Sequence, residues 1–482
     1  MIERMFHIMT FGCQMNANDS DWLRRSLFSR GFTEAEKPED ASVFILNTCS
    51  VREKPEQKVY SLLGRIQNMT QGREDVLVAV GGCVAQQVGR GFFNRFRQVR
   101  LVFGTDGLAS APQALDRLTE ETQLRMSLLD FSDEYPEKEQ DWTDGEVPAA
   151  GFVNIMQGCD NFCAYCIVPY TRGRQKSRST AAILEECRAM AARGTRDITL
   201  LGQNVNSFGQ DAHGDGTSFA ELLHSVADTE GLLRLRFVTS HPKDIADEVI
   251  EAFGSRTNIC PRLHLPMQSG SDEVLRRMGR KYDMARYRSI VDKLRAARPD
   301  LQLTTDIIVG FPGETEDDFQ QTLAAAREIG FAQSFSFNYS DRPGTKAEML
   351  ADKVSKEVMQ DRLQRYQDWQ SEYTEQVLQS MVGKTVDVLF EGMSRRQTGQ
   401  MVPETPDSPK GTAGTADAGD MREAAGQQAP AGGETWQGRD VYGQLVHVRL
   451  PEGMNMQGKC MSVRICEAKK HSLTGEGVGD PW

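Results

Sequence analysis

The chain has 482 residues, which is enough for two or three domains. Its 56 Lys and Arg are outnumbered by 68 Asp and Glu, and the formal charge of −12 excludes a uniformly basic nucleic-acid-binding protein. The N-terminus reads as a strand instead of a signal peptide, and no apolar run reaches the ~18 residues that cross a bilayer. We therefore expect a cytoplasmic protein without a membrane partner, in which the ten cysteines are ligands or buried thiols and not disulfides.

Three short β-prone runs within residues 1–130 each finish on a cysteine. The runs end at Cys13, Cys49 and Cys83, and helical stretches separate them. This alternation predicts a parallel α/β sheet, in which the carboxyl ends of the strands meet at one edge where ligands bind. We expect the three thiols to form one metal pocket there, with neighbouring glycines allowing close backbone approach. The alternative is that these cysteines are small core residues.

Two segments have compositions that are typical of solvated chain. Residues 131–148 are predicted to be a linker, because the stretch 130–146 holds eight acidic residues against a single cation, Lys138. The second segment, about 395–435, is built largely of Gly, Ala, Pro, Thr and acidic residues and is too poor in apolar residues to pack. It is predicted to be an insertion, because strand-like sequence resumes at Val441.

The most specific motif lies near the start of the central region, residues 149–378. Cys159, Cys163 and Cys166 follow a Cys-x3-Cys-x2-Cys spacing without a fourth cysteine nearby. Iron–sulfur clusters normally take four cysteines, so three thiolates would leave one iron of a four-iron cube open to a substrate. A zinc site usually needs a fourth Cys or His close by. The remaining cysteines lack partner spacing and are predicted to be structural thiols: Cys187, Cys260, Cys460 and Cys466.

The central region repeats a unit of β-run, polar strand end and amphipathic helix. Six such units are two fewer than a complete (β/α)8 barrel contains, and the active sites of such barrels lie at the carboxyl ends of the strands. Polar strand ends should therefore surround the cysteine loop. These ends are residues 157–159, 200–204, 237–241, 265–270, 308–314 and 338–342.

The last region, residues 379–482, alternates apolar and polar residues with turns between them, which predicts a small β-barrel of short antiparallel strands. Small barrels of this type bind nucleic acid through backbone charge and base stacking. A structural clamp on the rest of the protein is the alternative. The basic residues that could contact phosphates are Arg395, Arg396, Arg439, Arg449, Lys459, Arg464, Lys469 and Lys470.

These motifs resemble those of known families. The cysteine loop resembles the signature of the radical S-adenosylmethionine (SAM) enzymes, and the sequences around the first three cysteines resemble the N-terminal domain of the methylthiotransferases. Gly-Cys-Gln-Met-Asn at residues 12–16 is similar to the MiaB kind, which acts on tRNA, and the C-terminal barrel resembles a TRAM domain, an RNA-binding module. The segments that carry the resemblance are 10–20, 47–52, 81–86, 166–174, 201–207, 438–439 and 471–476.

The resemblance implies a fold of three parts, namely an N-terminal parallel α/β domain, a central partial (β/α)6 radical-SAM barrel and a C-terminal small antiparallel β-barrel. It also implies two [4Fe-4S] clusters. The cluster on Cys159, Cys163 and Cys166 would cleave SAM to a 5′-deoxyadenosyl radical. The cluster on the three N-terminal cysteines would hold the sulfur that is transferred and then methylated by a second SAM.

The implied reaction is methylthiolation at C2 of N6-isopentenyladenosine beside the anticodon of tRNA. An unactivated aromatic C–H bond has no useful acidity, so a radical route is expected and no acid or base residue is assigned. The implied partners are the anticodon stem-loop of tRNA, a sulfur donor and an electron donor such as flavodoxin or ferredoxin. Relatives that act on N6-threonylcarbamoyladenosine or on a ribosomal protein would use the same clusters, and a non-enzymatic RNA-binding iron–sulfur sensor is a further alternative.

The resemblance also suggests where SAM binds. Residues 202–204 replace the usual Gly-Gly-Glu contact with the methionine end of SAM, and residues 308–314 lie near its adenine. A basic run of Arg172, Arg174, Lys176 and Arg178 could hold the SAM carboxylate or the tRNA backbone, or could be a solvated face. Ordinary loop chemistry is the alternative throughout, since Gly and Pro also stop strands. The expected SAM contacts are Gly202, Gln203, Asn204, Ser240, Gln268, Ile308, Gly310 and Arg174.

Overall fold

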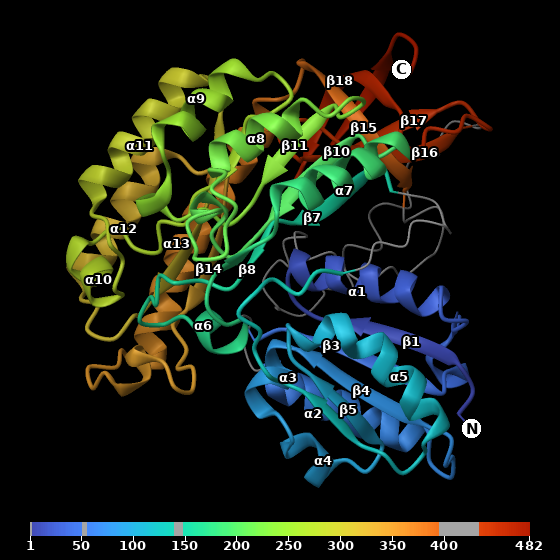
Figure 1. The fold of residues 1–482 in the computed structure, drawn as a ribbon. Coiled ribbons are helices and arrows are strands. Elements are labelled where there is room, and N and C mark those ends of the chain that lie inside the picture. The colour runs from blue at the N-terminus through green and yellow to red at the C-terminus, as the bar shows by residue number, and fades with distance from the viewer. Residues whose placement is uncertain (1, 51–54, 139–147, 395–432) are drawn as a thin grey trace, which may run out of the picture.

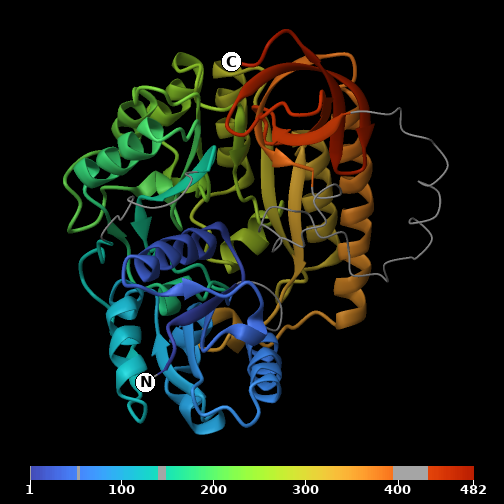
Figure 2. The same cartoon turned by 90° about the vertical axis from the view of Figure 1, so that its right-hand side faces the viewer.

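The structure is a computed structural model that describes residues 2–50, 55–138, 148–394 and 433–482. Figures 1 and 2 show an N-terminal α/β domain at one end, a small C-terminal barrel at the other and a larger α/β domain between them. The two chain termini lie at opposite ends of the molecule (Figures 1 and 2). Within these ranges, no helix combines the length and the apolar character needed to cross a membrane.

The N-terminal domain is built on a six-stranded parallel sheet with the strand order β2-β1-β3-β4-β5-β6. Every residue of β3, β4 and β5 is buried, as expected for parallel strands that are covered on both faces. The strands are β1 (Met5–Thr10), β2 (Thr33–Glu34), β3 (Val43–Thr48), β4 (Leu77–Gly82), β5 (Val99–Phe103) and β6 (Met126–Leu128).

Helices cover both faces of this sheet. Trp22 and Leu27 of α1 pack with Leu115 of α5 on one face, and Leu63 of α2 packs with Phe92 of α4 on the other. The helices are α1 (Gln14–Phe28), η1 (Pro38–Asp40), α2 (Pro55–Met69), α3 (Cys83–Val88), α4 (Gly91–Arg95), η2 (Gly107–Ser110) and α5 (Ala111–Glu120). The parallel α/β domain predicted from the sequence is confirmed.

The central domain is a partial barrel of six parallel strands. One sheet has the order β11-β10-β7 and the other β12-β13-β14, and a parallel bridge from Leu235 to Ile259 connects them. The strands are β7 (Ala150–Asn154), β10 (Asp197–Leu201), β11 (Arg234–Phe237), β12 (Arg262–His264), β13 (Gln302–Val309) and β14 (Gln333–Asn338), with a small hairpin of β8 (Met156–Gln157) and β9 (Lys176–Ser177). Five of the six strand ends predicted from the sequence are confirmed, whereas the first, residues 157–159, follows the hairpin strand β8, because β7 already ends at Asn154.

Helices pack around the outside of this partial barrel (Figure 1). Capping boxes begin two of them, with Ser218 and Glu221 at α8 and Thr315 and Asp318 at α12. The helices are α6 (Val168–Thr171), α7 (Thr180–Ala192), η3 (Val205–Ser207), α8 (Phe219–Ala227), η4 (Pro242–Asp244), α9 (Asp247–Ser255), α10 (Asp272–Arg277), α11 (Met284–Ala297), α12 (Glu316–Ile329), η5 (Lys346–Met349) and α13 (Lys356–Gln379).

The C-terminal region forms a closed barrel with the strand order β15-β16-β17-β19-β18. Four of its strand pairs are antiparallel, but β17 and β19 run parallel. A barrel with an odd number of strands cannot close with antiparallel pairs alone, so one parallel pair is required. The strands are β15 (Thr385–Met393), β16 (Glu434–Arg439), β17 (Leu445–Leu450), β18 (Cys460–Lys469) and β19 (Ser472–Val478). Most of the predicted insertion, residues 395–432, lies outside the described residues.

Three arginines attach this barrel to the amino-terminal ends of the central strands. The guanidinium of Arg234, the first residue of β11, donates to the carbonyl oxygens of Arg439 and Asp387, each at 2.7 Å. Arg236 and Arg262 donate to carbonyl oxygens of segment 440–442 at 2.9 to 3.0 Å. The barrel therefore docks at the end of the central domain that is opposite the strands' carboxyl ends.

The described part of the predicted linker, residues 131–138, packs between the N-terminal and central domains. Lys138 forms an ion pair with Asp19 of α1 at 2.5 Å, and Glu137 forms one with Arg178 at 3.1 Å. Lys138 departs from the prediction of a solvated linker, because its side chain is only 9% exposed and is paired with Asp19, whereas residues 131–134 and Glu137 are exposed. Residues 139–147 lie outside the described residues.

Candidate functional site

Cys13, Cys49 and Cys83 lie at the carboxyl ends of β1, β3 and β4, which are neighbours in the sheet. Thr48 pairs with Gly82, so the cysteines that directly follow these two residues begin side by side. The chain order reverses between β1 and β3, and ligands of doubly wound sheets bind at such a reversal point. The structure places the three predicted cysteines at the edge expected for a ligand.

Two glycines allow the strand ends to approach this closely. Gly12 has φ 107°, and a Cβ atom there would lie 2.0 Å from Cβ and 2.6 Å from Sγ of Cys49. Gly82 has φ 88°, and its Cβ would lie 2.3 Å from the carbonyl oxygen of Thr48. A side chain at either position would occupy space that the cysteine strand ends already fill.

A buried amide network fixes the positions of β1 and β3 behind the thiols. The side-chain amide of Asn16 donates to Asn47 Oδ1 at 2.9 Å and to the carbonyl oxygen of Thr48 at 3.0 Å. The amide of Asn47 donates in return to the carbonyl oxygen of Asn16 at 2.9 Å and to Ser20 Oγ at 3.0 Å. Asn16 Oδ1 accepts a hydrogen bond from the Cys13 thiol at 3.2 Å, so the network reaches a predicted ligand in its protonated form.

The electrostatics of this pocket favour a thiolate at Cys13. The pKa of Cys13 is lowered to about 6, chiefly by a hydrogen bond from Cys49. Burial opposes this shift, and the charge of Arg172 adds to it. Burial lowers the pKa of Arg172, but the negative charges of Cys83, Cys13, Asp19 and Cys49 outweigh this effect and raise it. Metal ligands must be deprotonated, so a pocket with a buried cation beside three thiols fits an iron–sulfur group.

Among the described residues, no group of three Cys, His, Asp or Glu side chains is gathered in a way that could hold one metal ion. This finding does not conflict with a four-iron cube, because each thiolate then meets a different iron and the sulfurs lie farther apart than the ligands of one ion.

The loop of Cys159, Cys163 and Cys166 follows β8 at the carboxyl ends of the central strands. The N–H of Cys166 donates to the carbonyl oxygen of Cys163 at 3.0 Å, and the N–H of Ala164 donates to the carbonyl oxygen of Met278 at 2.7 Å. These bonds fix the turn that carries Cys163 and Cys166, and the N–H of Cys159 donates to the carbonyl oxygen of Gly173 at 3.3 Å. A set of three thiols on one short loop suits three corners of a cluster and leaves the fourth iron for a substrate.

The thiols of this loop differ electrostatically from those of the N-terminal pocket. Burial raises the pKa of Cys159, and it raises the pKa of Cys166 to about 12. The guanidinium of Arg280 contacts the sulfur of Cys163 at 3.6 Å and supplies the nearby positive charge. The bound metal would have to displace these thiol protons.

Several predicted SAM contacts hold the loop and its neighbouring strand ends in place. Gln203 accepts a hydrogen bond from the N–H of Gly158 at 2.7 Å. Asn204 accepts one from the N–H of His241 at 3.2 Å and donates to Asp244 at 2.7 Å. A Cβ on Gly202 would lie 2.5 Å from Cγ of Met156, so this glycine allows the hairpin to pack closely.

Strained backbone is concentrated at this end of the domain. Phe162, Thr239 and Gln268 are the non-glycine residues with positive φ in the described ranges, and all three follow the carboxyl ends of central strands. Such strain often accompanies functional sites. Ser240 is buried beside them, and its hydroxyl has no hydrogen-bond partner among the described residues. Ser240 and Gln268 remain proposed SAM contacts.

The predicted adenine-side segment is anchored by residues that the sequence analysis did not single out. The N–H of Gly310 donates to Glu314 at 2.7 Å, and Arg362 of α13 donates to the same carboxylate oxygen at 2.9 Å. Burial raises the pKa of Glu314 to about 7, although both hydrogen bonds oppose this shift. Ile308 packs in the same apolar cluster as Tyr165 of the cysteine loop. The sequence could have indicated this anchor, because Glu314 directly follows the Gly-Phe-Pro-Gly turn at residues 310–313.

The basic run is mostly buried, so the alternative of a solvated face is wrong for three of its four members. Arg172, Lys176 and Arg178 are each at most 5% exposed. Lys176 forms an ion pair with Asp106. Only Arg174 is exposed; it forms an ion pair with Asp160 at 2.6 Å, and its guanidinium lies over the ring of Phe162, with Cζ 5.2 Å from the ring centroid.

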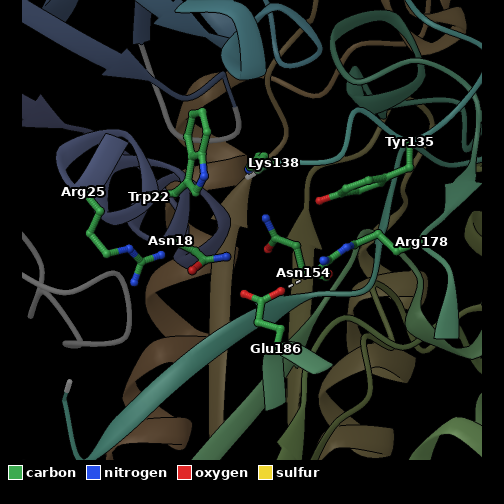
Figure 3. A pocket seen from close by; sticks show the side chains of 8 residues that line it. All are labelled: Asn18, Trp22, Arg25, Tyr135, Lys138, Asn154, Arg178 and Glu186. Carbon is green, nitrogen blue, oxygen red and sulfur yellow. Dashed lines mark hydrogen bonds and ion pairs between the residues drawn. The ribbon is translucent and has the colours of Figure 1, made fainter. Parts of the chain in front are cut away.

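Figure 3 shows a small cavity where α1, residues 135–138, β7 and α7 meet. Its free space of about 10 Å³ is that of roughly one water molecule, so it is far too small for SAM. Arg178 crosses this region and donates to Glu186 at 2.6 Å and to the carbonyl oxygen of Asn154 at 2.9 Å. The lining residues are Asn18, Trp22, Arg25, Tyr135, Lys138, Asn154, Arg178 and Glu186.

The basic residues predicted to contact phosphates are partly matched by acidic neighbours on the C-terminal barrel. Arg439 pairs with Glu391 at 3.2 Å and Arg464 pairs with Glu476 at 3.2 Å. Arg395 and Arg396 lie outside the described residues. Of the cysteines expected to be structural, Cys187, Cys260 and Cys460 are buried, whereas Cys466 is exposed.

Comparison with known proteins agrees with this arrangement. Residues 153–326 match the radical SAM superfamily, and residues 5–104 match the Uncharacterized protein family UPF0004. The fold resembles the radical S-adenosylmethionine methyltransferase TsrM from Kitasatospora setae, with a TM-score of 0.52 at 15% identity, over 72% of this chain and 74% of that one. This likeness concerns the fold alone. Radical SAM membership implies one [4Fe-4S] cluster and SAM.

Curated relatives are similar over the full length. The tRNA-2-methylthio-N(6)-dimethylallyladenosine synthase of Nitratidesulfovibrio vulgaris is 62% identical over 482 residues, covering 100% of both chains. The enzyme of the same name from Oleidesulfovibrio alaskensis is 62% identical over 480 residues, again covering 100% of both. That of Geobacter sulfurreducens is 46% identical over 82% of this chain and 88% of its own. The chain belongs to the family of tRNA-2-methylthio-N(6)-dimethylallyladenosine synthases.

Proposed function

We propose that this methylthiotransferase acts through two facing cysteine sites, one on the N-terminal domain and one on the central domain. It attaches a methylthio group to C2 of N6-isopentenyladenosine next to the anticodon of tRNA. Cys159, Cys163 and Cys166 are proposed to hold the cluster that binds SAM. The three N-terminal cysteines are proposed to hold a second four-iron cluster.

One observation supports this division of labour, namely that segments next to the two sets of cysteines touch across the domain interface. The side-chain amide of Gln203, at the end of β10, contacts the sulfur of Met15 in α1. Helix α6, which follows the cysteine loop, packs against α3, which begins at Cys83. A substrate held between the domains would therefore meet both sites.

When bound, the cofactors supply a 5′-deoxyadenosyl radical from SAM and a sulfur for transfer, which are reactions that protein side chains cannot perform. The chain supplies position and shielding. Residues 202–204 hold the cysteine loop against β10, and Glu314 holds the turn that contains Gly310. The buried amides of Asn16 and Asn47 keep the N-terminal thiols in register. No side chain is proposed as an acid or base.

The proposed SAM contacts are those expected from the family, with Ser240 and Gln268 supported by burial and local strain. Arg174 stands apart because it is exposed and paired with Asp160, so it suits a charged group that arrives from solvent. The proposed partners are the anticodon stem-loop, a sulfur donor and an electron donor such as flavodoxin or ferredoxin. The proposed domain limits are 1–130, 149–378 and 379–482.

Iron content and product analysis of cysteine variants test the proposal. Changing Cys159, Cys163 and Cys166 together to Ala should remove about half of the iron from anaerobically reconstituted protein and abolish formation of 5′-deoxyadenosine. Changing the three N-terminal cysteines to Ala should remove the other half and eliminate the methylthio product, while reductive SAM cleavage stays measurable. Full iron content in either triple variant contradicts the two-cluster assignment.

Nucleoside mass spectrometry tests the substrate. tRNA from cells that lack this gene should contain N6-isopentenyladenosine without its methylthio derivative, and the wild-type gene should restore the derivative. Unchanged methylthiolation of N6-isopentenyladenosine, with loss of methylthio-N6-threonylcarbamoyladenosine instead, contradicts the proposed substrate.

A further inference from the structure

Arg172 brings a guanidinium from the central domain into the three-cysteine pocket of the N-terminal domain. It follows α6, and its backbone N–H donates to the carbonyl oxygen of Val168 at 2.8 Å. Gly173 then takes φ 76°, so the chain turns immediately after the arginine. Arg172 is therefore presented by a tight, hydrogen-bonded turn, and it is only 3% exposed.

One terminal nitrogen of this guanidinium has a partner and the other does not. Nη2 donates to Asn16 Oδ1 at 3.2 Å, and the same oxygen accepts the Cys13 thiol at 3.2 Å. Nη1 is buried and makes no hydrogen bond to any described residue. A buried, charged donor without an acceptor is costly, so this nitrogen indicates that an acceptor, preferably an anion, binds beside it in the working protein.

A second polar atom in the same region is also left without a partner. Ser50 directly follows Cys49 and is 1% exposed, and its hydroxyl has no hydrogen-bond partner in the described part of the chain. The carboxylates that satisfy the neighbouring basic residues do not serve Arg172, because Lys176 pairs with Asp106 and Arg178 pairs with Glu186. Arg172 thus differs from the other buried cations of its segment.

We infer that Arg172 is a sulfur-binding residue, whose free N–H donates to the small sulfur anion held in the pocket of Cys13, Cys49 and Cys83. The ligand class is a hydrosulfide or an alkanethiolate. This inference rests on the proposed sulfur-carrying role of that pocket. The planar guanidinium suits this role, because one of its nitrogens donates to Asn16 while the other is free to donate to an anion. A lysine ammonium is a point charge without this fixed fork of two donors.

Arg172 belongs to the central domain, whereas the three-cysteine pocket belongs to the N-terminal domain. The N-terminal pocket lacks this donor unless the central domain is docked against it, so the sulfur anion is bound most tightly in the arrangement in which the two cysteine sites face each other. A sulfur anion that binds the cluster in a separated domain would lack a charge-assisted hydrogen bond.

Titrations with sodium sulfide and with methanethiol test the inference. They use the full chain with Cys159, Cys163 and Cys166 changed to Ala, so that the iron–sulfur signal comes from the N-terminal pocket alone, and binding is followed by EPR of the reduced, reconstituted protein. Arg172→Gln should weaken binding by about tenfold or more, as expected for a lost hydrogen bond to a charged group. Arg172→Lys keeps the charge and should weaken binding by a smaller factor. Arg188→Gln, at an exposed position on α7, is the control and should leave the affinity unchanged.

The outcomes separate this inference from the function on which it rests. If neither sulfide nor methanethiol binds to parent protein that retains its iron, the proposed role of the pocket fails. If both bind and Arg172→Gln retains iron and affinity, the inference is overturned and Arg172 only ties the domains together. If Arg172→Gln loses its iron, the test rests on the affinity of Arg172→Lys for the two probes. Weakened binding by Arg172→Lys supports the inference, and unchanged binding overturns it. Weakening with only one of the two probes supports it and identifies the anion.

Discussion

Gly12→Ala tests whether the close approach of two strand ends is required by the N-terminal pocket. The added methyl group would lie 2.0 Å from Cβ of Cys49, whereas ordinary van der Waals contact begins at 3.4 Å, so one of the two must move by about 1.4 Å. Metal ligands tolerate displacements of about 0.2 Å. The expected shift is several times larger than a ligand can absorb, and the cluster should be lost.

Gly72→Ala separates this clash from the cost of the backbone conformation. Gly72 also has a positive φ, 84°, and lies in the same domain, but a Cβ atom there meets nothing within 4 Å. Both variants place alanine in the left-handed region at a cost of about 1 to 2 kcal/mol. Any difference between them in cluster content therefore comes from contact with Cys49.

Iron analysis, 5′-deoxyadenosine formation and methylthio product formation are measured on both reconstituted variants. Gly12→Ala should lose about half of its iron and all of the methylthio product, while SAM cleavage continues. Gly72→Ala should keep full iron content and product. The reasoning is refuted if Gly12→Ala retains the iron content and product yield of Gly72→Ala.

Three further outcomes are expected. Burial raises the pKa of Glu314 from 4.5 to about 7, so the folded state binds more protons than the unfolded state between these values, and stability should fall as pH rises through this window. Arg362→Met removes a group that lowers this pKa, so the fall should extend above pH 7 and the loss of Tm should be larger at pH 8 than at pH 5.5. An equal loss of Tm at both pH values would contradict this expectation. Arg236→Gln removes the partner of buried Asp197 and two bonds to the C-terminal barrel, so hydrogen exchange in β16 and β17 should accelerate while SAM cleavage is unchanged. Truncation after Ser380 should weaken binding of an anticodon stem-loop and flatten its salt dependence, because fewer phosphate contacts release fewer counterions; an unchanged affinity and slope would make the barrel a structural cap.

The parts of the fold that follow from local sequence pattern were predictable. Cys49 and Cys83 come directly after fully buried strands, and parallel strands deliver their carboxyl ends to one edge, so a shared location follows from periodicity and chain order. The cysteine loop was equally accessible, because its three ligands lie within eight residues of one another. In both cases the local sequence pattern is enough to predict where the cysteines lie.

The partners of the basic run could not be predicted in this way. Lys176 pairs with Asp106, seventy residues earlier, and Arg172 contacts Asn16 in another domain. The sequence shows only that these side chains are positive, and an isolated positive charge is normally solvated. The buried ion pair of Lys138 with Asp19 escaped prediction for the same reason, since a count of charges does not reveal which opposite charge a side chain meets.

The positions of the cysteine loop and the C-terminal barrel constrain how a substrate is held. The loop lies at the carboxyl ends of the central strands, and Arg234, Arg236 and Arg262 attach the barrel at their amino ends. The eight residues of β13 span about 26 Å at about 3.3 Å per residue. A free nucleoside cannot contact both ends. If the barrel binds RNA, we expect it to contact the tRNA away from the modified base, and therefore to contribute to affinity and salt dependence without entering the chemistry.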